Sequence, residues 1–517
     1  MFPQEYDFSI RATPLFLSFV FLLSLGALLF VYRNSFGVKP SGDDFTALHQ
    51  VHRGEQEGAW TFFIASDGGD YRPLQNVTFW LFGTFSERHV LLSLRILHFL
   101  SFAFYALVAF LWIHALNFSR IGAVAAACVV IFHPVLAGPL AGLDNYTRLV
   151  VSALVWLGAW VAYSYANKPL LALPLVSICF VIGLGYMEYA ISLIPLAVLA
   201  TVWRAEKQRF RWAARMLICL IAILTAYFLV RVSGLVVTSS GAGHLSPNPL
   251  IWVKNAGMML ASILFFGNTV SIMLGMSLPK IAWLGSNIAL VACAVGYGLW
   301  VGNRYSVPFV TGYSGTRSAA EANGLIPLQF LGVAFVISFF PMLLMKHISE
   351  IYLTPITLPL ALLTGLAAHG WTAVSRPFQY VAIFFAISQL LLASNAIQSK
   401  VAGVNDAGER ADGMIQQVLK HIPNDGQRKK AAIVFLKENV AQSKNYSIFA
   451  LPDDLLIQAG YATYAVRWFR PNQDIFLDHF VVEDPHDVDL KLFDRVLLWD
   501  DSIKQFTPIS PTLRIRE

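Results

Sequence analysis

The sequence predicts a polytopic α-helical membrane protein that ends in a small soluble α/β domain. Of its 517 residues, 56% are hydrophobic and only 13% are charged, whereas a soluble globular chain carries roughly 25% charged residues. Apolar runs close to the ~20 residues that cross ~30 Å of hydrocarbon recur along the first three quarters of the chain. The composition becomes polar from about Ser399, so a second, soluble part follows the membrane part.

The apolar runs predict about eleven membrane spans. They lie near residues 14–32, 90–115, 121–136, 147–166, 169–186, 188–203, 216–236, 281–301, 327–345, 351–371 and 378–395. The first run lacks the small-residue pattern at which a signal peptide is cleaved. We therefore expect it to remain in the protein as the first span. The third run is short and ends at His133-Pro134, which predicts a broken or re-entrant segment. Residues 250–276 suit either an interfacial hairpin or one more span, and a span there would reverse every later loop.

Basic residues in short loops predict the orientation of the bundle. The densest cluster lies between the sixth and seventh spans: Arg204, Lys207, Arg209, Arg211 and Arg215. We therefore expect this loop in the cytoplasm. Counting spans from this loop back to the start of the chain places the N-terminus in the cytoplasm and the loop 33–89 outside. Counting spans forward from it places the C-terminus outside.

Two regions outside the spans are long enough for structure of their own. The loop 33–89 is too long for a simple connection, and its mixed apolar and polar segments predict interfacial helices. Residues 399–517 predict a small α/β domain, with a helix over 407–421 and strands over 431–436 and 495–498. We therefore divide the chain into a membrane module, 1–398, and an outer domain, 399–517.

An acidic pair, Asp43 and Asp44, follows the first span. Adjacent carboxylates repel, and a low-dielectric surface raises a carboxylate pKa. One of the two suits a general base, and the other suits an orienting role or a ligand of a divalent cation, the one cofactor we keep open. The alternative is an N-cap on the helix that begins near Phe45, since aspartate favours that position.

A second candidate, Tyr71-Arg72, stands later in the same loop before Pro73-Leu74. The arginine fork suits phosphate, and the proline favours an extended conformation of the residue before it. The alternative is an arginine that reaches toward lipid headgroups.

Further polar residues stand at the expected outer ends of later spans, and we take them as candidates for the binding of substrate or donor phosphate. They are Tyr146, Arg148, Glu188, Lys346, His347, Glu350 and Tyr352. Ionisable residues at a bilayer suggest function. The alternatives are a plain polar loop around Arg148 and helix caps at Glu188 and Glu350.

Other residue types exclude some classes. The net charge of +6 is modest and fits cytoplasmic loops and membrane lipids rather than nucleic acid. The four cysteines lie in apolar runs, so we expect buried apolar side chains rather than disulfides or metal ligands: Cys128, Cys179, Cys219 and Cys293.

Taken in order, these motifs resemble those of GT-C-type integral membrane glycosyltransferases, with the nearest likeness to the bacterial relatives of the transmembrane O-mannosyltransferases. Four features of this family recur here in the same order: the acidic pair, the Tyr71–Leu74 motif, the His133-Pro134 end of the third span, and an acidic residue early in the sixth span. Residues 349–355 match part of a late motif of the family. The chain departs from the family at Ile351, where an arginine is usual, and it lacks tetratricopeptide repeats, so mannose is not implied.

The resemblance implies that the predicted bundle of about eleven transmembrane helices has a GT-C-like fold, and it implies an activity. It implies an inverting enzyme that moves one sugar from a polyprenyl-phosphate donor to a hydroxyl of a protein, lipid or glycan acceptor outside the membrane, with Asp43 as base and Asp44 as support. The expected location is the bacterial inner (plasma) membrane, with the site facing the periplasm. The alternatives are a flippase or transporter and an oligosaccharide polymerase or ligase for lipid-linked saccharides.

Overall fold

The computed structural model describes most of the membrane part and the core of the C-terminal sheet. The described residues are 12–40, 44–64, 71–84, 89–204, 208–232, 248–267, 278–304, 325–344, 350–371, 374, 376–424, 427–436, 469–470, 475–482, 492–500, 502–503 and 505–509.

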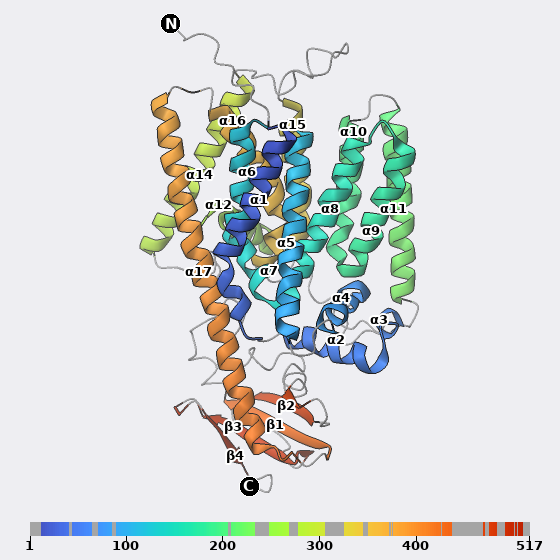
Figure 1. The fold of residues 1–517 in the computed structure, drawn as a ribbon, viewed down its shortest axis with the longest axis vertical. Coiled ribbons are helices and arrows are strands. Elements are labelled where there is room, and N and C mark those ends of the chain that lie inside the picture. The colour runs from blue at the N-terminus through green and yellow to red at the C-terminus, as the bar shows by residue number, and fades with distance from the viewer. Residues whose placement is uncertain are drawn as a thin grey trace.

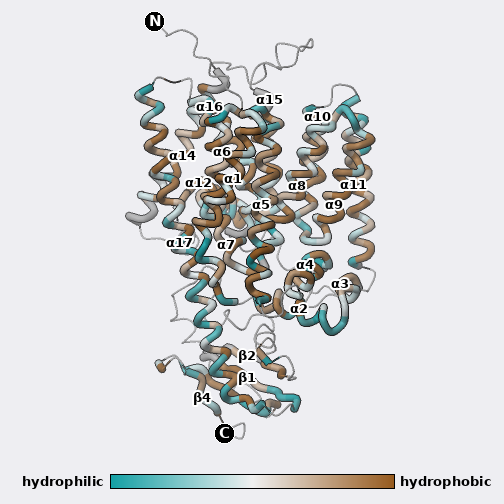
Figure 2. The backbone as a smooth tube through the Cα atoms, viewed as in Figure 1, coloured by the Kyte–Doolittle hydropathy of each residue, from teal (hydrophilic) through white to brown (hydrophobic). Residues whose placement is uncertain are grey.

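A bundle of apolar helices makes up the body of the molecule (Figure 1). Its long helices are α1 (Pro14–Val31), α5 (Val90–Ala115), α6 (Arg120–Phe132), α8 (Tyr146–Ser164), α9 (Pro169–Tyr186), α10 (Leu193–Arg204), α11 (Arg209–Val232), α12 (Pro249–Leu264), α14 (Leu278–Arg304), α15 (Leu325–Leu343), α16 (Thr354–Trp371) and α17 (Arg376–His421). Apolar residues dominate along these helices, as Figure 2 shows, except on the half of α17 that lies toward the sheet. The expected fold class is confirmed.

All eleven expected spans coincide with helices, although fewer pass a strict test of length and hydropathy. Among the described residues seven helices pass, or eight when the bent pair 120–132 and 134–141 counts as one span. The expected spans that fall short are α10, α15 and α16. Helix α12 has 16 residues, about 24 Å at 1.5 Å per residue, which is shorter than the hydrocarbon layer. The described part of 250–276 is therefore one short apolar helix, and the choice between an interfacial hairpin and a span stays open.

The break after α6 was expected from His133-Pro134. The chain turns through 40° there and continues as η2 (Pro134–Leu136), α7 (Ala137–Ala141) and η3 (Leu143–Asn145). Proline cannot supply the N–H that a continuing helix needs. The His133 ring nitrogen Nδ1 instead accepts the N–H of Val135 at 3.3 Å, and this bond caps the new turn.

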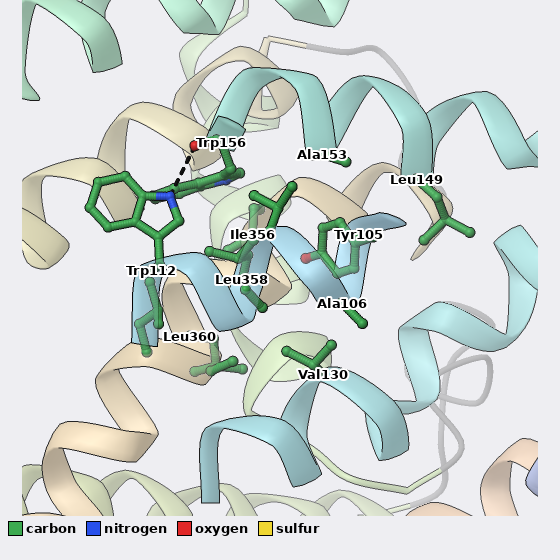
Figure 3. Close-up of a cluster of buried hydrophobic side chains, with 14 of the residues drawn as sticks. Tyr105, Ala106, Trp112, Val130, Leu149, Ala153, Trp156, Ile356, Leu358 and Leu360 are labelled. Carbon is green, nitrogen blue, oxygen red and sulfur yellow. Dashed lines mark hydrogen bonds between the residues drawn. The ribbon is translucent and has the colours of Figure 1, made fainter. Parts of the chain in front are cut away.

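The bundle core lies where α5, α6, α8 and α16 meet (Figure 3). Trp112 and Trp156 pack edge to face at 5.7 Å, and the Trp112 indole donates to the Trp156 carbonyl at 2.9 Å. Helices α6 and α16 approach closely because Gly122 faces Gly365. A Cβ on either glycine would lie 2.7 Å from the other's carbonyl oxygen.

Short helices and the sheet gather at one end of the bundle (Figure 1). These short helices are α2 (Asp44–Glu57), α3 (Thr61–Ile64) and α4 (Pro73–Thr84). The chain also has the short turns η1 (Arg33–Gly37), η4 (Glu188–Ser192) and η6 (Glu350–Leu353). The ends of α10 and α11 that carry Arg204 and Arg209 lie at the opposite end of the bundle. The loop 33–89 thus contains helices, α2, α3 and α4, and their interfacial position stays a prediction.

The C-terminal sheet has the strand order β2-β1-β3-β4. Its strands are β1 (Lys429–Leu436), β2 (Ile475–Val482), β3 (Arg495–Asp500) and β4 (Gln505–Ile509). Strand β1 pairs in parallel with β2 and β3, and β4 is antiparallel to β3. The helix expected over 407–421 is the end of α17, one helix of 46 residues. The proposed division at residues 398/399 therefore falls inside a continuous helix.

Candidate active site at the α2–α4 end of the bundle

The candidate site begins with Asp44, the first residue of α2. Its side chain is buried, and its Oδ1 atom accepts a hydrogen bond from the backbone N–H of Leu143 in η3. The bond joins the loop after the first span to the turn that follows the α6 break. Asp44 therefore acts as an anchor, and a carboxylate bound in this way has less freedom to take a proton from a substrate.

A buried arginine, Arg95 of α5, stands beside Asp44. Its guanidinium donates to the carbonyls of Val38 at 3.0 Å, Leu140 at 3.4 Å and Ala141, and it interacts electrostatically with the Asp44 carboxylate. A buried charge needs both a counter-charge and hydrogen bonds, and Arg95 has both.

A charge cluster forms on the other side of α4. Glu188, at the start of η4, lies 2.8 Å from the Arg231 Nη1 atom and 3.7 Å from the Arg72 Nη2 atom. Arg72 precedes α4, and Arg231 stands in the last turn of α11. Two guanidiniums and one carboxylate leave one net positive charge, which suits an anion. All three side chains are partly exposed, so a ligand can reach them.

Aromatic residues form a wall next to this charge cluster. The rings of Tyr71 and Tyr227 lie 6.1 Å apart, and the Tyr227 hydroxyl donates to the Tyr71 carbonyl at 3.3 Å. The Tyr71 hydroxyl donates to the Phe63 carbonyl of α3 at 3.2 Å. Burial raises the pKa of Tyr71, so this hydroxyl stays a donor at neutral pH. The wall holds Arg72 between α3 and α11.

Tyr146 connects the two charged groups. It is fully buried at the start of α8, and its hydroxyl donates to the Gln75 carbonyl of α4 at 3.2 Å. Its ring packs against His98, 5.7 Å away, on the Arg95 side and against Tyr186, 6.3 Å away, on the Glu188 side. No part of the Tyr146 side chain is exposed, and its contacts join α8 to α4 and α5.

A further cation, Arg148, lies two residues along α8. Its guanidinium stacks over the Tyr352 ring of η6 at 4.6 Å, and its Nε atom donates to Asn145 at 3.3 Å. The structure thus brings two expected site residues, Arg148 and Tyr352, into contact although they are far apart in sequence.

Some expected site residues fall outside what can be described. Asp43, Lys346 and His347 are not among the described residues, and the side chain of Glu350 is not described either. Within the described part of the chain, no group of three or more histidine, cysteine, aspartate or glutamate residues could hold a metal ion. The four cysteines are all free, and Cys293 is exposed on α14, so its expected burial is wrong.

Sequence reasoning missed two site residues, Arg95 and Arg231. Each is an arginine near the end of an expected span, and an ionisable residue in such a run is itself a signal of function. Their partners are the unpredictable part, because Arg95 bonds to carbonyls about 45 and 57 residues away and Arg231 to a carboxylate 43 residues away.

The fold and the site together define a polytopic membrane protein with an anchored carboxylate and a cationic cluster at one end of its bundle. No protein-family model matches the chain, and no curated protein matches it either. Among solved structures, the crystal structure of ArnT from Cupriavidus metallidurans bound to undecaprenyl phosphate aligns with 93% of this chain and 93% of that one. The sequence identity is 13% and the TM-score is 0.46, a likeness too low to carry an argument about function.

Proposed function

We propose that this chain is an inverting GT-C-type glycosyltransferase that takes a single sugar from a polyprenyl-phosphate donor. The observation that carries the proposal is the Arg72–Glu188–Arg231 cluster, which has a net positive charge at the end of an apolar bundle. A lipid phosphate needs apolar surface for its tail and cations for its headgroup, and arginine supplies paired donors to phosphate oxygens.

The proposed reaction joins an acceptor hydroxyl to the sugar. Asp43 removes the hydroxyl proton, the oxygen attacks the anomeric carbon, and the bond from that carbon to the phosphate oxygen breaks with inversion. The leaving phosphate gains negative charge as the bond breaks, and positioned cations stabilise that charge in the transition state. We assign Arg72 and Arg231 to the phosphate and Asp44 to the support of the loop that carries Asp43.

The role of Glu188 in this proposal is to hold two arginines close together in the absence of donor. Two like charges repel at short range, and the carboxylate between them offsets that repulsion. An arriving phosphate competes with Glu188 for the same guanidinium donors.

We also propose the orientation that the basic loop predicts. The end of α10 and the start of α11, which the basic loop joins, lie at the end of the bundle opposite α2–α4 and the sheet, and basic loops stay in the cytoplasm. The candidate site and the sheet would then face the periplasm of a bacterial inner membrane. The acceptor, a hydroxyl of a protein, lipid or glycan, would approach from that side.

The test is a donor panel assayed with three proteins in lipid: wild type, Asp43→Asn and Asp406→Asn. Asp406 is an exposed aspartate on α17 and serves as the matched control. We expect wild type and Asp406→Asn to release polyprenyl phosphate from one donor in the presence of membrane-extract acceptors, and folded Asp43→Asn to release none. Equal release by Asp43→Asn would remove this residue as the base.

Two further outcomes would redirect the assignment. Release only from a pyrophosphate-linked oligosaccharide would identify a polymerase or ligase, and movement of lipid-linked saccharide across vesicles without release would identify a flippase. Activity that persists in a strong chelator would exclude a divalent cation bound by Asp43 and Asp44.

A further inference from the structure

The segment between α1 and α2 runs alongside α17. Near its start, Asn34 donates to the Gln398 side chain at 3.1 Å, and Gln398 donates in turn to the Val31 carbonyl. The segment 32–40 therefore follows a helix that is more than 350 residues away in sequence.

The contact becomes closest at Lys39. The Lys39 Nζ atom lies 2.7 Å from Asp412 Oδ2, and Gly408 faces the Lys39 backbone. A Cβ atom at position 408 would overlap the Lys39 carbonyl oxygen, so glycine is the residue that permits this approach. We call Gly408, Asp412 and Lys39 the latch.

The far end of the same helix is bonded to the C-terminal sheet. Gln417 accepts the backbone N–H of Phe506 in β4 at 3.0 Å, and Arg470 donates to the Leu419 and Ile422 carbonyls at 2.7 and 2.8 Å. One apolar core also unites α2, this part of α17 and the strands. It includes Phe45, Leu48, Ala411, Ile415, Ile433 and Leu497.

The acidic pair follows the latch directly in sequence. Asp43 is four residues beyond Lys39, a separation of at most ~14 Å of chain. The carbonyl of Val38 is bonded to Arg95, and Asp44 is bonded to Leu143. Fixed points thus stand on both sides of the proposed base.

We propose that the latch makes α17 and its sheet a positioning element for the acidic pair: Gly408 and Asp412 fix the segment that carries Asp43 and Asp44. The C-terminal domain then contributes to transfer by placing the base, without touching substrate. This inference rests on the proposed function for its catalytic consequence, whereas the latch itself can be tested without activity.

The first measurement uses a spin label in the full-length protein with its four cysteines replaced by alanine. Gly37→Cys is the labelling site because position 37 is exposed and a Cβ there meets nothing within 4 Å. We expect Asp412→Lys to increase the mobility of the label, Lys39→Asp combined with Asp412→Lys to restore it, and Asp406→Asn to leave it unchanged. Equal mobility in Asp412→Lys and Asp406→Asn would overturn the latch.

The second measurement is the turnover of the same variants with the donor that wild type uses. Because small displacements of a reacting group cost on the order of tenfold to a hundredfold in rate, we expect Asp412→Lys to lower kcat by about tenfold or more with the donor KM unchanged. The charge swap should restore kcat, which a general loss of stability would not predict. Increased mobility of the label with unchanged kcat would overturn the positioning role. Failure of wild type to transfer any sugar would overturn the proposed function, and the mobility of the spin label would still test the latch.

Discussion

The Asp44 carboxylate accepts a hydrogen bond from the backbone N–H of Leu143, 99 residues along the chain. An acidic pair can contain a structural anchor and a catalytic base, and this bond makes Asp44 the anchor. Leu143 is bonded on its other side too, since its carbonyl lies 2.9 Å from His98 Nε2. Asp44 is therefore part of a buried polar network that fixes the start of α2, which supports the proposal that Asp44 is the anchor of the pair and Asp43 the base.

Removal of the Asp44 carboxylate should destabilise the protein. Asp44→Ala leaves the buried N–H of Leu143 without its acceptor and the buried Arg95 without its counter-charge, so it should cost about 3 kcal/mol or more. Asp44→Asn keeps an acceptor oxygen, so it should cost less. Thermal unfolding in detergent measures both, with Asp406→Asn as the control. A stability for Asp44→Ala equal to that of the control would contradict the anchoring role.

Loss of Arg95 should have a larger effect. Arg95→Met leaves the Asp44 charge without its buried counter-charge and three carbonyls without a donor, and breaking a buried pair costs about 3–5 kcal/mol. Arg33→Gln is the matched control because Arg33 is exposed and bonds to one carbonyl, and it should stay within about 0.5 kcal/mol of wild type. Equal unfolding midpoints for Arg95→Met and Arg33→Gln would show that the network contributes little.

The phosphate assignment predicts opposite effects for the two members of the Arg231–Glu188 pair. Arg231→Gln removes a cation, and a charge-assisted bond contributes about 1.5–3 kcal/mol, so the affinity for polyprenyl phosphate should fall roughly 10-fold to 100-fold. Glu188→Gln removes the competing carboxylate, so it should bind the same lipid more tightly. Native mass spectrometry with titrated lipid measures both affinities, and the same sign for both variants would refute the competition.

The sequence predicted the membrane bundle well because span length and apolarity are local properties. The break at His133-Pro134 and the helices of the loop 33–89 are local as well, and both were found. Contacts between distant segments were not predictable in this way: Arg95 looked like one polar residue in an apolar run, and its carbonyl partners come from the segment after η1 and from α7. The continuity of α17 was also missed, because the change in composition near Ser399 marks where the helix becomes polar and not where it ends.

The latch should be insensitive to pH across the physiological range. A hydrogen bond and the charge of Asp412 raise the pKa of Lys39 above its usual 10.5. A raised lysine pKa means that the contribution of the pair is complete below pH 10.5 and is lost only as pH rises through the higher folded-state value. Mobility of the label at position 37 should therefore stay constant from about pH 6 to 9. An increase within that range would show that another group controls the segment.

Two glycines on α17 give the sharpest comparison, since both lie in the same helix but only one faces a neighbour. Glycine in a helix interior is less favourable than alanine by roughly 0.5–1 kcal/mol. At Gly413 a Cβ meets nothing within 4 Å, so Gly413→Ala should stabilise the protein and leave kcat unchanged. At Gly408 the added methyl meets the backbone of Lys39, so the segment must shift and kcat should fall on the order of tenfold. Turnover and unfolding of the two variants in parallel measure this, and equal turnover would show that the acidic pair tolerates displacement of the segment that carries it.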